Sequence, residues 1–371
     1  MNSGGNNVKR LRVRMVCAGV ALALLSACGP GGPKRDTDGD GGTSTGGSTT
    51  KVTGLSLVAG DGASAGQVNA KGAAARFNTP RGIVIDSKGN LFVADELNFA
   101  IRQIAQDGTV TTFAGTLGAQ DYVDNIGNDA RFVRPTALAI DAADNLYVTD
   151  QLRIRKITPD RVVSTVTTLD APLNATDAVL NQLIPAGIAV DGNANLFVTT
   201  GIGTRRFAAA NPGGYRMLEG SASSNNVAGT ATLAPRGIAA NSAGAAWVAG
   251  LQGADSISRV DAGGTTLAVY AGTDGQSGST NDVGLNARFG RIVALAADKD
   301  GNLYAADAGN NAIRKITTNV NLTTVAGTVG SNKLATGALP GSLAELRGIA
   351  VAGDGTLYVT SGQAVVKIVL P

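Results

Sequence analysis

Hydrophobic and polar positions alternate with a period of two over most of the chain from residue 51 onward. The pattern begins with the apolar run Gly82–Asp86, followed by a polar turn at 87–90 and a second run, Leu91–Asp95. This period, with many β-branched residues, predicts strands joined by tight turns. Two further strands are expected at Ile101–Ala105 and Thr109–Ala114, before a long loop rich in Gly, Asp and Ala.

The four-strand unit recurs six times. Its landmark leucine, or the residue that replaces it, lies 50–57 residues from the next one, at Leu91, Leu146, Leu196, Ala246, Leu303 and Leu357. Four antiparallel strands per unit predict the blades of a β-propeller. The alternative is a β-solenoid, which would leave its end rungs open and would not need one long loop in every unit.

The two ends of the repeat region complement each other. The sixth unit ends after its third strand, Val365–Leu370, whereas Val52–Gly60 resembles the fourth strands of other units. We therefore expect an all-β, six-bladed propeller over residues 51–371, in which this N-terminal segment completes the last blade and removes two free sheet edges.

Two units carry the most specific pattern. Pro80–Asp86 with Asn90–Asp95, and Asp300–Asp307 with Ile313–Ile316, resemble the NHL-repeat family of propellers. Units three and four depart from it, because Thr200 and Gly250 replace the Asp after the second strand. The resemblance implies the fold alone, since this family includes enzymes, sensors and scaffolds.

The first 27 residues are predicted to be a lipoprotein signal peptide. A basic segment precedes an apolar run, Met15–Ala27, that is too short to span a bilayer. The run ends in Leu25-Ser26-Ala27-Cys28, which resembles the bacterial lipobox and implies acylation of Cys28; the alternative is an ordinary leader with a chance Cys. Residues 28–50 then form a Gly/Ser/Thr-rich tether. Because Gly29 rather than Asp follows the Cys, the resemblance implies the outer membrane, facing the periplasm or the cell surface.

Charge and composition exclude several partners and chemistries. The formal net charge is +3, but four basic residues and no acid lie in the first 27 residues, so the remainder carries about −1. We therefore expect no nucleic-acid binding. The chain has no His, and its two Cys residues are Cys17 and Cys28. The mature chain thus lacks the commonest general base and zinc ligand, and it cannot form an internal disulfide. No cofactor or metal is predicted, and we expect a monomer.

Three acidic residues recur after second strands, and three arginines recur in the strands that follow. A ring of carboxylates for a metal is one interpretation, and buried structural ion pairs are the other. Recurrence in several blades favours the structural role, because a fold residue is needed in every copy. Arg-Phe pairs that close the long loops are expected to place the aromatic ring between blades. The residues concerned are Asp95, Asp150, Asp307, Arg102, Arg155, Arg314, Phe77, Phe132 and Phe289.

Arg81, Arg236 and Arg347 are the candidate ligand-binding residues. Each precedes the Gly that opens an innermost strand, so each is expected at the mouth of the central channel. The mouth lies on the face formed by the long loops 60–79, 115–134, 272–291 and 327–346, called here the long-loop face. Guanidiniums there could bind a carboxylate, a phosphate or an acidic side chain; the alternative is pairing with nearby Asp residues or loop carbonyls.

The leading functional hypothesis is a tethered, non-catalytic module that recognises an envelope or extracellular protein or glycan through the long-loop face. The alternative is a divalent-metal-dependent, lactonase-like hydrolase, since similar propellers hold a metal in the channel through Glu, Asn and Asp. Of the three glutamates after residue 50, only Glu345 is expected near the start of an inner strand. A third possibility is a structural member of an envelope complex.

Overall fold

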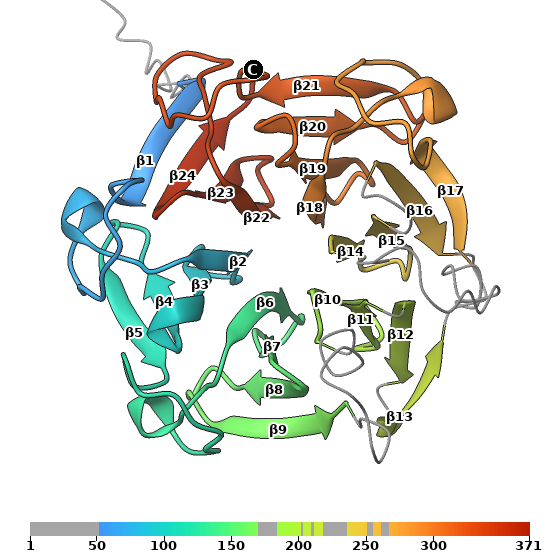
Figure 1. Cartoon of the computed structure of the whole chain (residues 1–371). Helices are drawn as coiled ribbons and strands as arrows, with labels where there is room; N and C mark the ends of the chain where they lie inside the picture. Colours follow the sequence, from blue (N-terminus) through green and yellow to red (C-terminus); the bar gives the residue numbers. More distant parts are fainter. Residues whose placement is uncertain are drawn as a thin grey trace, which may run out of the picture. The chain divides into compact units, whose positions relative to one another are not determined.

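The computed structural model describes residues 52–169, 184–201, 203–208, 236–250, 255–260 and 267–371, and the backbone of the strand at 211–217. Within these residues the chain forms six four-stranded antiparallel sheets. Figure 1 shows them arranged as blades around a central axis, with the first strand of each blade innermost. The six-bladed β-propeller expected from the repeat is confirmed. The leader, Cys28 and the tether lie outside the described residues.

The strand bounds follow the predicted units closely. The first three blades comprise β2 (Pro80–Ile85), β3 (Leu91–Asp95), β4 (Ala100–Ile104) and β5 (Val110–Ala114); β6 (Pro135–Ile140), β7 (Leu146–Asp150), β8 (Arg153–Ile157) and β9 (Val163–Thr168); and β10 (Gly187–Val190), β11 (Leu196–Thr200), β12 (Gly203–Ala208) and β13 (Asn211–Met217).

The other three blades comprise β14 (Ile238–Ala240), β15 (Ala246–Ala249), β16 (Ser256–Val260) and β17 (Leu267–Gly272); β18 (Ile292–Ala297), β19 (Leu303–Asp307), β20 (Ala312–Ile316) and β21 (Leu322–Ala326); and β22 (Leu346–Val351), β23 (Leu357–Ser361), β24 (Ala364–Val369) and β1 (Gly54–Gly60). Short 3-10 helices lie in the connections: η1 (Gly72–Ala74), η2 (Glu96–Asn98), η3 (Gly127–Asp129) and η4 (Gly284–Asn286). No helix among these residues has the length and apolarity needed to cross a membrane.

The ring closes through strands from both ends of the described chain. β1 is the outer strand of blade six and pairs antiparallel with β24, from Gly54 opposite Val369 to Gly60 opposite Ala364. Leu55 is buried in this blade. Gly60 has φ +84°, and a Cβ there would come within 2.3 Å of the Gln363 carbonyl oxygen, so the strand can end here only with glycine. The predicted closure is confirmed.

The apolar core consists of clusters shared between neighbouring blades. Phe92 and Phe113 of blade one pack edge to face, with ring centroids 4.7 Å apart. Their cluster includes Phe132 from the long loop and Leu138 of blade two. One face of each blade therefore becomes buried only when the next blade packs on it.

The recurrent Asp and Arg residues form buried ion pairs, as the structural interpretation predicted. The Asp95 carboxylate accepts from Arg102 Nη1 at 2.7 Å and from the Asn78 backbone N–H at 2.7 Å, and both charged side chains are fully buried. The Arg102 guanidinium lies over the Phe77 ring, 5.3 Å from its centroid. Blades two and five repeat this Asp–Arg–Phe unit with Asp150, Arg155 and Phe132, and with Asp307, Arg314 and Phe289.

The opposite face carries tight turns. The Asp86 carboxylate accepts from the backbone N–H groups of Lys88 and Asn90, and Asp141 and Asp191 close equivalent turns. These acids stabilise the turns between first and second strands. The candidate site therefore lies at the other end of the channel.

Candidate functional site

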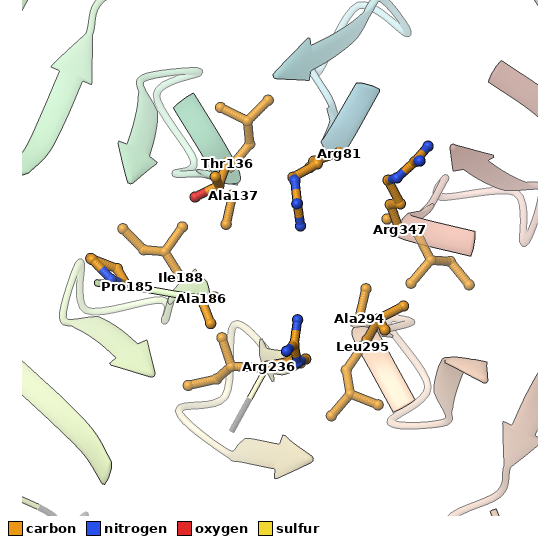
Figure 2. A pocket seen from close by; sticks show the side chains of 18 of the residues that line it. Arg81, Thr136, Ala137, Pro185, Ala186, Ile188, Arg236, Ala294, Leu295 and Arg347 are labelled. Atoms are coloured by element: carbon orange, nitrogen blue, oxygen red, sulfur yellow. The ribbon is translucent and has the colours of Figure 1, made fainter. Parts of the chain in front are cut away.

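A cavity of about 650 Å³ lies where the inner strands begin, at the end of the channel to which the long loops lead. This volume is within the range of small-molecule sites. The residues that form its wall come from all six blades, as Figure 2 shows for ten that it labels. Among the described residues the charged members of the wall are Arg81, Arg134, Arg236, Arg291, Arg347, Glu96 and Glu345. The described part of the wall therefore carries three net positive charges.

The three arginines predicted from the sequence all line this cavity. Arg81, Arg236 and Arg347 occupy equivalent positions, two residues before the first Ile of their inner strands. In Figure 2 the side chains of Arg81 and Arg236 extend into the cavity from opposite walls, whereas that of Arg347 is turned away from the centre.

Two further arginines were missed by sequence reasoning. Arg134 and Arg291 precede Pro135 and Ile292, the residues that pair with the Asp at the end of the second strand. They thus enter the cavity two positions earlier in the inner strand than the arginines of the Arg-Gly pairs on which the prediction relied. The signal that could have found them is the alignment of each long-loop end to that Asp.

Glu96 corrects the expectation that Glu345 alone would approach an inner strand. It opens η2 directly after β3 and is only 1% exposed. One carboxylate oxygen accepts from Arg81 Nε and the other from Arg134 Nε. Glu96 therefore holds the guanidiniums of blades one and two at a fixed separation and neutralises part of their charge.

Arg347 is satisfied by its own blade. Its Nη1 donates to the Gly362 carbonyl oxygen and its Nη2 donates to Glu345, each at 2.7 Å. The Glu345 side chain is 64% exposed, so this ion pair is screened by solvent. For Arg347 the structure therefore shows the alternative interpretation, in which the arginine pairs with an acid and a loop carbonyl.

Arg236 and Arg291 have no acidic partner among the described residues. Protein atoms crowd the Arg236 guanidinium although the residue reaches solvent at the mouth, and this desolvation lowers its pKa. The positive charges of Arg291 and then of Arg81 lower it further. The Arg236 guanidinium is therefore repelled by two other cations of the cavity, an arrangement that an anion would stabilise.

Blade three provides an apolar part of the wall. Ile184 and Ala186 occupy the two positions where other blades have arginine, and Pro185 and Ile188 complete this part of the wall. Blade four packs closely on this strand, because a Cβ added to Gly187 would come within 2.3 Å of the Arg236 carbonyl oxygen. The apolar wall and the Arg236 cation are thus neighbours.

A divalent metal does not fit this arrangement. Both oxygens of Glu96 already accept from arginine, and the nearby guanidiniums would repel a cation. Over the part of the chain that the structure describes, no three Asp, Glu, His or Cys side chains are grouped as a metal site requires.

Comparison by sequence matches only a small part of the chain. No family model matches the chain. The chain is 36% identical over 100 residues to chicken (Gallus gallus) teneurin-1, a match that covers 25% of this chain and only 4% of the length of that protein.

Solved structures cover far more of the chain. A structural genomics protein of unknown function from Bacteroides thetaiotaomicron VPI-5482 superposes with a TM-score of 0.68 at 15% identity, over 86% of this chain and 76% of its own. An auxiliary nutrient binding protein of the same bacterium gives 0.64 at 14% identity, over 86% and 77%. The gluconolactonase XC5397 of Xanthomonas campestris gives 0.52 at 13% identity, over 80% and 87%. The shared fold is the β-propeller. At these identities the likeness extends to the fold alone.

Proposed function

We propose that this protein is a binding module of the bacterial cell envelope and that it takes an acidic group of its ligand into the central cavity. The observation that carries the proposal is the pair Arg236 and Arg291, which lack an acidic partner among the described residues in a cavity lined by five arginines. Guanidinium groups bind carboxylate and phosphate in bidentate geometry. The cavity is therefore suited to a protein or glycan that carries such a group.

The positive charge is local. The chain after the leader carries about −1 overall, so the cavity is the electropositive part of a nearly neutral molecule. Such a concave charged site attracts an anionic group at short range without binding polyanions over the whole surface.

A lactonase-like reaction with a bound metal is the weaker candidate. It needs oxygen ligands that are free to bind a divalent cation. Glu96, the most buried carboxylate of the wall, instead accepts hydrogen bonds from two arginines. The Bacteroides neighbour whose name refers to nutrient binding is compatible with a binding role, although the likeness to it concerns the fold.

Envelope attachment is part of the proposal and is carried by the sequence Leu25–Cys28. The replacement Cys28→Ser should yield a protein that lacks the lipid mass and leaves the membrane fraction. Mass spectrometry of the mature N-terminus measures this directly. An unlipidated wild-type protein, or a variant that stays with the membrane, would contradict the attachment.

Binding is tested by calorimetric titration of the full-length protein with glucuronate, phosphate and acetate, with glucose as the neutral control. At least one anion should bind, and Arg236→Gln/Arg291→Gln should weaken it at least tenfold, equivalent to about 1.4 kcal/mol. Lys88→Gln is the matched control, because Lys88 is an exposed cation in a turn on the opposite face. Equal binding by the double arginine variant, or no anion binding by the wild type, would overturn the proposal.

A further inference from the structure

The cavity wall is asymmetric in charge and in polarity. Arg236 and Arg291 come from blades four and five, and both lack an acidic partner among the described residues. Ile184, Pro185 and Ala186 of blade three lie beside Arg236. Figure 2 shows Pro185, Ala186 and Ile188 together on one side of the cavity, next to the wall that carries Arg236.

The other three arginines of the wall already bind groups of the protein itself. Glu96 binds Arg81 and Arg134 through their Nε atoms, and Arg347 donates to Glu345 and to a carbonyl oxygen. An anionic group of the ligand therefore binds most favourably beside Arg236 and Arg291, where it replaces water without displacing a protein carboxylate.

From this asymmetry we infer that the ligand presents a carboxylate joined to a short aliphatic body. The inference rests on the proposed function and specifies the ligand of that site. The carboxylate lies between the guanidiniums of Arg236 and Arg291, and the body covers the blade-three wall formed by Ile184 and Ala186. Both wall residues are partly exposed, so an aliphatic group placed on them removes apolar surface from water.

This chemistry has two sources, a free aliphatic acid and the carboxyl terminus of a peptide that ends in an aliphatic residue. Both place apolar carbon within a few bonds of the carboxylate, and the volume of about 650 Å³ accepts either one. The peptide end would bring further chain out over the long-loop face, whereas the free acid would be enclosed.

The test compares four probes by calorimetry on the full-length protein: acetate, 4-methylpentanoate, N-acetyl-leucine and N-acetyl-leucinamide. We expect 4-methylpentanoate or N-acetyl-leucine to bind at least tenfold more tightly than acetate, and the amide to bind at least tenfold more weakly than N-acetyl-leucine. Tighter binding of 4-methylpentanoate indicates the free acid, and tighter binding of N-acetyl-leucine indicates the peptide end.

Two variants locate the aliphatic body. Ile184→Thr should remove most of the advantage of 4-methylpentanoate over acetate, while Val269→Thr, a similar change at an exposed position of the outer strand β17, should leave it within twofold. Acids that bind through Arg236 and Arg291 with no gain from the alkyl group would overturn this inference and leave the proposed function standing. If no acid binds, both fail.

Discussion

Glu96 determines how the charges of the cavity are distributed. It is almost fully buried, yet its two partners, Arg81 and Arg134, have side chains that are 35% and 46% exposed. Glu96 is therefore a buried anion that pairs with two cations at the solvent boundary. Its position between blades one and two means that it contributes both to packing and to the electrostatics of the site.

Replacing Glu96 by Gln should lower stability and raise anion affinity together. The Gln amide is uncharged and can accept from only one of the two guanidiniums, so after allowance for solvent screening we expect a loss of about 1–2 kcal/mol in the free energy of unfolding. The released guanidiniums should bind acetate severalfold more tightly. Chemical denaturation and calorimetry measure the two effects.

Glu345→Gln is the matched control for that variant. Glu345 lies at the same mouth and also pairs with an arginine, but its side chain is largely exposed. Its removal should change the free energy of unfolding by less than about 0.5 kcal/mol. A Glu96→Gln protein that is as stable as wild type and binds acetate no better would contradict the role assigned to Glu96.

Residue positions in the cavity were only partly predictable. The Arg-Gly pairs disclosed Arg81, Arg236 and Arg347 because each begins an innermost strand at the same place in its repeat. Glu96 and Arg134 were not found, since they are 38 positions apart and belong to different blades. Their contact depends on how neighbouring blades pack, which the pattern within one repeat does not contain.

At the scale of the blade, the Asp–Arg–Phe unit of blades one, two and five fixes the long loop to the strands beneath it. In blade one, Arg102 donates to the loop carbonyls of Arg76 and Val68 in addition to Asp95. Blade six has no buried ion pair at this place. The equivalent buried positions are held by uncharged residues, Leu343, Ser361 and Val366. The Ser361 hydroxyl exchanges hydrogen bonds with the Ala344 backbone there.

Placing the blade-six residues at the equivalent positions of blade one tests this equivalence. Asp95→Ser alone leaves the Arg102 guanidinium buried without a carboxylate and should lower the free energy of unfolding by about 3–5 kcal/mol. Adding Arg102→Val should recover about 2 kcal/mol, because the uncompensated charge is removed. Urea denaturation of the single and double variants measures the difference. A double variant that is less stable than the single one would show that the ion pair cannot be replaced by apolar packing.

At the scale of the whole molecule, closure of the ring was predictable from the chain ends. A sixth unit that ended after three strands and an isolated fourth-strand sequence near residue 55 permit few other arrangements for a six-unit repeat. The register of the closing strand was less predictable. β1 contains an irregularity between Leu57 and Ala59, and this bulge depends on the partner strand β24.

Deleting residues 52–60 should open the ring. The deletion exposes the β24 edge and removes the buried side chains of Leu55 and Ala59. We expect a large fall in melting temperature and the appearance of oligomers, measured by calorimetry and light scattering. Deleting residues 41–49 of the predicted tether removes the same number of residues and should leave both properties unchanged. A monomeric deletion variant with wild-type melting would contradict closure by β1.

The most direct measurement of how the cavity binds its ligand is the difference electron density of a crystal soaked with 4-methylpentanoate, in a lattice that leaves the long-loop face open. We predict density for the carboxylate between the guanidiniums of Arg236 and Arg291, with the alkyl group against Ile184 and Ala186. Density for the acid at another site, or an accessible central cavity that holds only solvent at saturating ligand, would contradict it.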